Sequence, residues 1–170
     1  GISIAHHNNL VHAQLNEQLR HFGLSTAKVP EDVNLERLLR TTIPLHDIGK
    51  PQSVTDGIDT LGRALRSQDE FAKLTPRQQQ VVQGLRTLNP DQLRGVKSLP
   101  ELDQKLLSLG YRNDDARAAR NFIRDHTDAF QHEFTLPILR DKLTRLGFSE
   151  NEIRIASTFV NNDVLGDLAK

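Results

Sequence analysis

Apolar residues recur every three or four positions over most of this 170-residue chain, and nowhere do they alternate with polar residues as in a half-buried strand. The first such pattern runs from about Ile4 to Phe22 and ends at Gly23. The chain therefore predicts an all-α fold. Its length suits one domain, residues 1–170, whose core is large enough to be stable without cross-links.

Helix start and stop signals divide the rest of the chain. A second helix is expected to begin after Pro30 and to run into His46-Asp47. Residues 49–57 contain two glycines and a proline and are expected to form a loop. His132 is also expected to lie in a loop. Later helices are predicted to follow caps or capping boxes at Thr75, Ser98, Asn113-Asp114 and Ser149.

Residues 109–126 and 146–163 resemble each other without gaps. Each segment has a Leu-Gly-aromatic stop, a cap, and a helix with a phenylalanine, Phe122 or Phe159, four residues before a group able to bind a ligand. Any two helical hairpins that end in Leu-Gly look alike, so both chance and duplication remain open. In either case the pattern predicts that His126 and Asp163 occupy equivalent inward-facing positions.

Composition narrows the range of functions. The 22 basic and 22 acidic residues cancel, which does not favour a strong nucleic-acid or anionic-membrane partner. Without cysteine, any metal must be held by nitrogen and oxygen ligands. No apolar run is long enough to span a membrane and no signal peptide is visible, so we expect a cytoplasmic protein. The chain begins with Gly1 and lacks methionine, as in a domain taken from a longer protein.

Residues 45–51, Leu-His-Asp-Ile-Gly-Lys-Pro, form the most informative motif. His46 and Asp47 would point in different directions on a regular helix, and they converge on one ion only if the helix ends there. Gly49 permits that end, Pro44 would kink the preceding helix, and Lys50 would present an ammonium group suited to a phosphate oxygen.

This segment resembles the HDIGK signature of the HD superfamily of metal-dependent phosphohydrolases. The resemblance implies a helical bundle of the HD-domain type, in which His7, His46, Asp47 and Asp163 bind the metal. His7 is selected because residues 7–11 have the family's H-x-x-x-V form, and Asp163 because a glycine follows three residues later. Helical periodicity alone does not separate His7 from His12.

The resemblance also implies an activity: hydrolysis of a phosphomonoester or phosphodiester, in a nucleotide-like substrate, by a metal-activated water. The expected cofactor is a divalent ion, Mn, Fe, Co, Ni, Zn or Mg. One ion is expected, because no histidine lies between Pro51 and Asp125. Asp47 would bind metal and orient the nucleophile, and Lys50 would offset phosphoryl charge. His126 resembles a later histidine of some HD domains and is a candidate for a second ion or for the substrate.

Two alternatives remain open at this stage. The missing mid-chain histidines also fit a non-catalytic HD-fold module that binds a nucleotide or a protein. The order of HDIGKP, a later histidine and a final aspartate resembles the HD part of some tRNA nucleotidyltransferases, which would make a cyclic 2′,3′-phosphodiester a sensible substrate.

Overall fold

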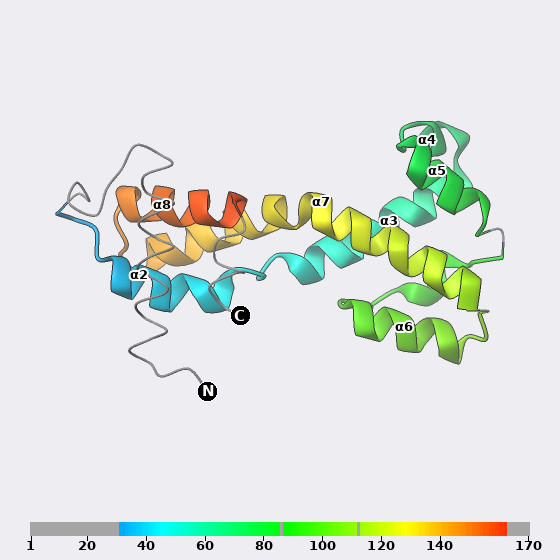
Figure 1. Ribbon diagram of the computed structural model, residues 1–170, viewed down its shortest axis with the longest axis horizontal. Coiled ribbons are helices and arrows are strands. Elements are labelled where there is room, and N and C mark those ends of the chain that lie inside the picture. The colour runs from blue at the N-terminus through cyan, green and yellow to red at the C-terminus, as the bar shows by residue number, and fades with distance from the viewer. Residues whose placement is uncertain (1–30, 86, 112, 163–170) are drawn as a thin grey trace. The chain divides into compact units, whose positions relative to one another are not determined.

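The computed structural model describes residues 31–85, 87–111 and 113–162, and every regular element in these ranges is helical (Figure 1). The prediction of an all-α fold is therefore confirmed. Contacts divide the chain into two compact units, Gly1–His46 with Leu139–Lys170, and Asp47–Ile138. Each unit is described by itself.

In the first unit, neighbouring residues set both ends of helix α2 (Leu35–Thr42). Its N-cap is Asn34, whose side chain accepts a hydrogen bond from the Arg37 N–H. Pro44 lacks an N–H and cannot continue the α-helical ladder. It lies instead in the first turn of a short 3₁₀ helix, η2 (Ile43–Leu45), so the predicted disturbance at Pro44 is confirmed.

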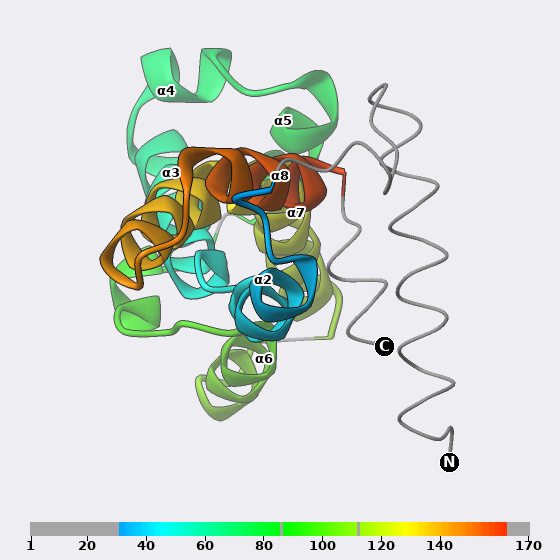
Figure 2. The same ribbon diagram turned by 90° about the vertical axis from the view of Figure 1, so that its left-hand side faces the viewer.

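Helix α8 (Glu150–Asn161) packs against α2, and Figure 2 shows both helices facing the viewer. The buried Glu152 carboxylate connects their N-termini. One oxygen accepts the Asn34 N–H at 3.0 Å and the other accepts the Ser149 N–H at 2.9 Å. The second bond belongs to the predicted capping box at Ser149, which is confirmed. Both helices also bury apolar side chains: Leu38, Leu39, Ile153, Ile155, Ala156, Phe159 and Val160.

Most of the helices that the structure describes lie in the second unit. They are α3 (Lys50–Arg66), α4 (Gln68–Ala72), α5 (Pro76–Gln83), the 3₁₀ helix η3 (Pro90–Leu93), α6 (Leu99–Ser108) and the first part of α7 (Asn113–Arg145). The caps predicted at Thr75 and Ser98 are present. The predicted loop at residues 49–57 is wrong, because α3 begins at Lys50. Pro51 lies in the first turn, where its missing N–H costs nothing, and Gly57 lets α7 approach closely.

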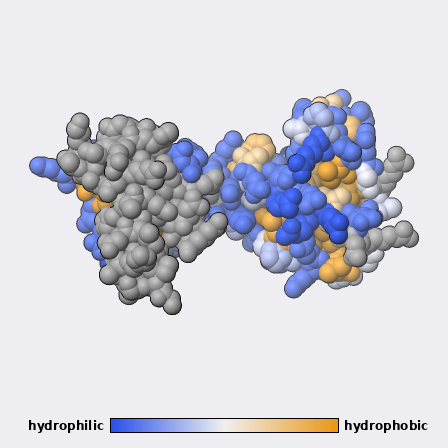
Figure 3. Space-filling model, viewed as in Figure 1, coloured by the Kyte–Doolittle hydropathy of each residue, from blue (hydrophilic) through white to orange (hydrophobic). Residues whose placement is uncertain are grey.

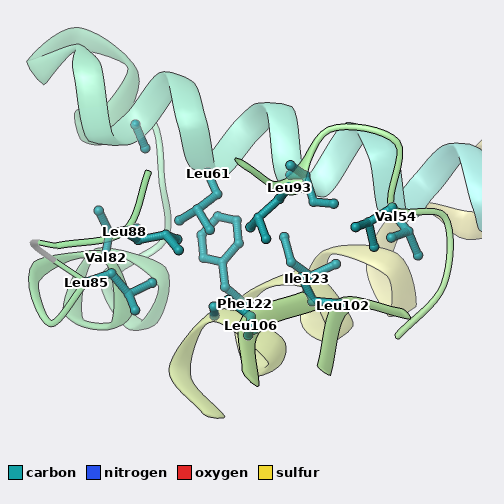
Figure 4. Packing of buried hydrophobic residues seen from close by; sticks show 14 residues of the cluster. Val54, Leu61, Val82, Leu85, Leu88, Leu93, Leu102, Leu106, Phe122 and Ile123 are labelled. Atoms are coloured by element: carbon teal, nitrogen blue, oxygen red, sulfur yellow. The ribbon is translucent and has the colours of Figure 1, made fainter. Parts of the chain in front are cut away.

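The core of this unit lies where α3, α5, α6 and α7 meet. Figure 4 shows Phe122 of α7 pointing toward Leu61 of α3, and both side chains are almost completely buried. The same cluster of buried residues contains Val54, Ile58, Ala64, Val82, Leu85, Leu88, Leu93, Val96, Leu102, Leu106, Ala119 and Ile123.

The internal similarity has a physical basis at the two helix ends. Gly110 and Gly147 have φ angles of +83° and +86°, a conformation that other residues adopt at a cost. After each glycine, the aromatic residue donates its N–H to a carbonyl five residues earlier, at 3.2 and 3.0 Å. Phe122 and Phe159 are each 1% exposed. His126 is buried as predicted, whereas Asp163 lies outside the described residues.

Helix α7 continues well past His126. It is 33 residues long, so His132, which was expected in a loop, lies in a helix instead. On the face of the second unit seen in Figure 3, hydrophilic residues cover most of the surface and hydrophobic residues form smaller separate areas. Within the part of the chain that the structure describes, no helix has the length and apolar character needed to cross a membrane.

Two neighbouring leucines of α6 test the core. Leu106 is fully buried and Leu107 is 62% exposed. Leu106→Ala should lower the free energy of unfolding by about 2–5 kcal/mol, because it leaves a cavity in the cluster. Leu107→Ala, the matched control, should change it by less than about 0.5 kcal/mol. Urea unfolding followed by circular dichroism measures both, and equal losses would contradict the assignment of Leu106 to the core.

Candidate functional site

The HDIGK motif forms the turn that follows η2 and leads into α3. His46 is half-buried and Asp47 is exposed. The His46 N–H donates to the Ile43 carbonyl at 3.3 Å, and the Asp47 carbonyl accepts the Lys50 N–H at 2.9 Å. The α-helical ladder therefore does end before the His-Asp pair, which is the condition under which adjacent side chains can converge.

The His46 ring is oriented by its own backbone. Its Nδ1 lies 2.6 Å from the Ile43 carbonyl oxygen. A carbonyl only accepts, so Nδ1 carries the hydrogen and donates it. In the neutral ring this leaves the lone pair on Nε2, and an Nδ1–H to carbonyl bond is the usual support for a histidine that binds metal through Nε2.

Lys50 occupies the first position of α3. Its carbonyl accepts a hydrogen bond from the Ser53 hydroxyl at 2.6 Å, and the Ser53 N–H donates to the Gly49 carbonyl at 3.0 Å. These bonds fix the backbone of the first turn. The lysine is thus attached to a helix N-terminus, where backbone N–H groups and the helix dipole favour an anion.

Gly49 anchors this turn to helix α7. Its N–H donates to the Thr135 hydroxyl at 3.0 Å, and Thr135 is completely buried. A Cβ on Gly49 would lie 2.3 Å from the Thr135 backbone nitrogen and 2.5 Å from the Phe134 carbonyl carbon. Only glycine allows the two backbones to come this close, so the residue has a packing role as well as ending the turn.

His126 makes a polar contact that the sequence did not reveal. Its Nε2 lies 2.7 Å from Oδ2 of Asp56 on α3. The imidazole also packs on Phe130, with ring centroids 4.7 Å apart, and on Gly57, where a Cβ would meet the ring at 3.2 Å. His126 is therefore held between α3 and α7, and nothing in the described residues gives it a metal partner.

The structure describes only two of the four predicted metal ligands. His46 and Asp47 are adjacent in the turn, whereas His7, its rival His12, and Asp163 lie outside the described residues. Among residues 31–85, 87–111 and 113–162, no three His, Asp or Glu side chains are grouped closely enough to hold a metal ion. The four-residue ligand set stays a prediction.

Asp56 and Thr135 are the two residues that sequence reasoning missed. Asp56 lies 70 positions from His126, and Thr135 lies 86 positions from Gly49. Neither partner belongs to a motif. A weak signal existed in Gly49 and Gly57, since glycines eight residues apart in a helix can mark a close approach by another backbone.

Comparison of the chain with protein-family models, with curated proteins and with solved structures gave no match.

Replacing Gly49 tests the close approach to α7. Gly49→Ala should lower the free energy of unfolding by about 3 kcal/mol, because the new Cβ overlaps backbone atoms that cannot move away easily. Gly84→Ala is the matched control: Gly84 has φ of −80°, and the nearest atom to its added Cβ lies 3.4 Å away. The control should raise stability by up to about 1 kcal/mol. Chemical unfolding of both variants compares them.

Two substitutions separate the hydrogen bond made by the Thr135 hydroxyl from the packing of the Thr135 side chain. Thr135→Val keeps the volume but leaves the buried Gly49 N–H without an acceptor, at a cost of about 1–3 kcal/mol. Thr135→Ser keeps the acceptor and loses one methyl group, which costs about 0.8 kcal/mol. Hydrogen exchange of the Gly49 amide should quicken in the valine variant alone. Equal exchange in both variants would mean that the hydroxyl does not hold the turn.

Proposed function

We propose that this protein is a metal-dependent phosphohydrolase of the HD type, with His46 and Asp47 at its centre. The observation that carries the proposal is the bond from His46 Nδ1 to the Ile43 carbonyl, which in the neutral ring assigns the lone pair to Nε2 in the first residue of an HDIGK motif.

The donor set suits a divalent cation. An imidazole nitrogen and a carboxylate are ligands that Mn, Fe, Co, Ni and Zn accept, and two more would come from His7 and Asp163. When bound, such an ion would supply Lewis acidity and a water whose pKa is lowered to about 7 in the best cases. In this proposal one ion is held, and His126, which is bonded to Asp56, has no part in a second metal site.

The remaining steps belong to the protein's own residues. In this proposal the Asp47 carboxylate, exposed at the turn, would bind the metal and orient the attacking water. Lys50 would offset the charge that grows on the phosphoryl oxygens. The backbone between them is fixed by the Asp47 carbonyl and by the bond from Gly49 to Thr135, so both side chains extend from a rigid turn.

The expected substrate is a phosphomonoester or phosphodiester with a nucleotide-like leaving group. The balanced net charge gives little support for tight binding to long nucleic acids, so small substrates are the first choice for assays. A cyclic 2′,3′-phosphodiester belongs in the same panel, because the motif order also resembles the HD part of RNA-processing enzymes.

Removing Asp47 tests the proposal. Asp47→Ala should reduce phosphate or nucleoside release at least about 100-fold, since the carboxylate serves both metal and nucleophile. Asp69→Ala, which removes an exposed carboxylate from α4, should retain full activity. Both are assayed with each of the divalent metals added in turn, and circular dichroism shows that each variant is folded.

Two outcomes would contradict the proposal. One is full metal-dependent activity in folded Asp47→Ala. The other is a protein, purified without chelator, that contains no metal, cannot be loaded with any, and hydrolyses none of the phosphoesters. The second outcome would favour the non-catalytic binding module.

A further inference from the structure

The contact between His126 and Asp56 places an oriented carboxylate at the surface of the second unit. The His126 side chain is 6% exposed and that of Asp56 is 41% exposed. An ionised carboxylate only accepts hydrogen bonds, so Nε2 carries the hydrogen and donates it to Oδ2 at 2.7 Å. A buried imidazole therefore orients a solvent-facing carboxylate, which still has lone pairs on both oxygens for a further donor.

This carboxylate borders a cavity of about 460 Å³, which we call the Asp56 pocket. Its wall combines charged, polar, apolar and aromatic side chains from α3, from the segment before α6, and from α7: Pro51, Gln52, Thr55, Asp56, Asp59, Lys97 and Phe134. The size is that of a small-molecule site.

The wall of the Asp56 pocket carries two acidic side chains and one basic side chain. Asp59 and Lys97 are exposed, and neither forms an ion pair with any residue that the structure describes. Asp56 and Asp59 are three positions apart on α3 and so lie on one side of that helix. The pocket therefore offers two carboxylates on one element and a single ammonium group on another.

A guanidinium group fits this wall best. It is planar, donates two parallel hydrogen bonds to a carboxylate, and stacks on an aromatic ring such as Phe134. It also tolerates partial loss of water better than an ammonium group does. Lys97 would pair with an anionic group elsewhere on the same ligand.

We propose that the Asp56 pocket binds a small guanidinium compound that also carries an anionic group, with His126 as the residue that positions Asp56. This site uses neither His46 nor Asp47, so it stands apart from the phosphohydrolase proposal.

Isothermal titration of the full chain with arginine and with agmatine tests the site. Buffer with chelator excludes any effect of a bound metal. Arginine should bind with one-to-one stoichiometry, and agmatine should bind a few fold more weakly, because it lacks the carboxylate that pairs with Lys97. In Lys97→Met arginine should lose its advantage over agmatine.

Neutral variants identify the carboxylates that matter. Asp56→Asn and Asp59→Asn should each weaken arginine binding by about tenfold or more, as expected for loss of a charge-assisted hydrogen bond. Asp69→Asn, the matched control on α4, should bind as the unaltered chain does. Circular dichroism of each variant shows that it is folded.

Three results would overturn the proposal. They are no saturable arginine binding at about 10 mM, equal arginine affinity in the unaltered chain and in both neutral variants, or binding of a nucleotide such as GMP in the pocket without competition from arginine. Phosphoester hydrolysis enters none of these measurements, so failure of either proposal is seen independently of the other.

Discussion

The close approach of the Gly49 backbone to Thr135 is the constraint on which the second unit depends. Without a side chain at Gly49, the start of α3 lies directly against α7, and one hydrogen bond to a buried hydroxyl fixes the distance. About two turns further along, Gly57 of α3 lies against the His126 ring. Further along α3, Leu61 meets Phe122 of α7 in the core (Figure 4).

Buried polar side chains act as connectors in both units. Glu152 accepts N–H groups from the starts of two helices, Thr135 accepts the Gly49 N–H, and His126 donates to Asp56. Each would cost free energy if buried without a partner, and each partner is distant in sequence or at a helix terminus. These contacts therefore specify which elements meet, in addition to the apolar contacts that hold them together.

Helix α3 contributes residues to both functional proposals. Lys50 is at its N-terminus, directly after the His-Asp turn, and Asp56 and Asp59 follow on its second and third turns. The phosphohydrolase proposal relies on local chemistry in the turn: a fixed histidine tautomer, an exposed carboxylate and a lysine at a helix start. The guanidinium proposal relies on a contact between helices. The two proposals use different residues of α3, because Lys50 follows the His-Asp turn whereas Asp56 and Asp59 line the Asp56 pocket.

Much of the helical structure was predictable because it depends on neighbours within a few positions. The caps at Thr75, Ser98 and Ser149 were read correctly, and so was the burial of His126. The loop predicted at residues 49–57 is wrong, because glycines that usually mark a loop here allow two helices to pack closely. His132 was misplaced because nothing near it indicates that α7 runs on to Arg145.

The sequence by itself determined the all-helical class and the helix ends at Gly110 and Gly147, because each depends on spacing and on residue type over a few positions. Only the tertiary structure decided that Thr135 would hold Gly49 and that Asp56 would receive His126. Those pairs join positions 86 and 70 residues apart, and their meeting is set by how α3 packs on α7. The spacing of apolar residues along the sequence does not predict such packing, because it depends on the shapes of two helix surfaces together.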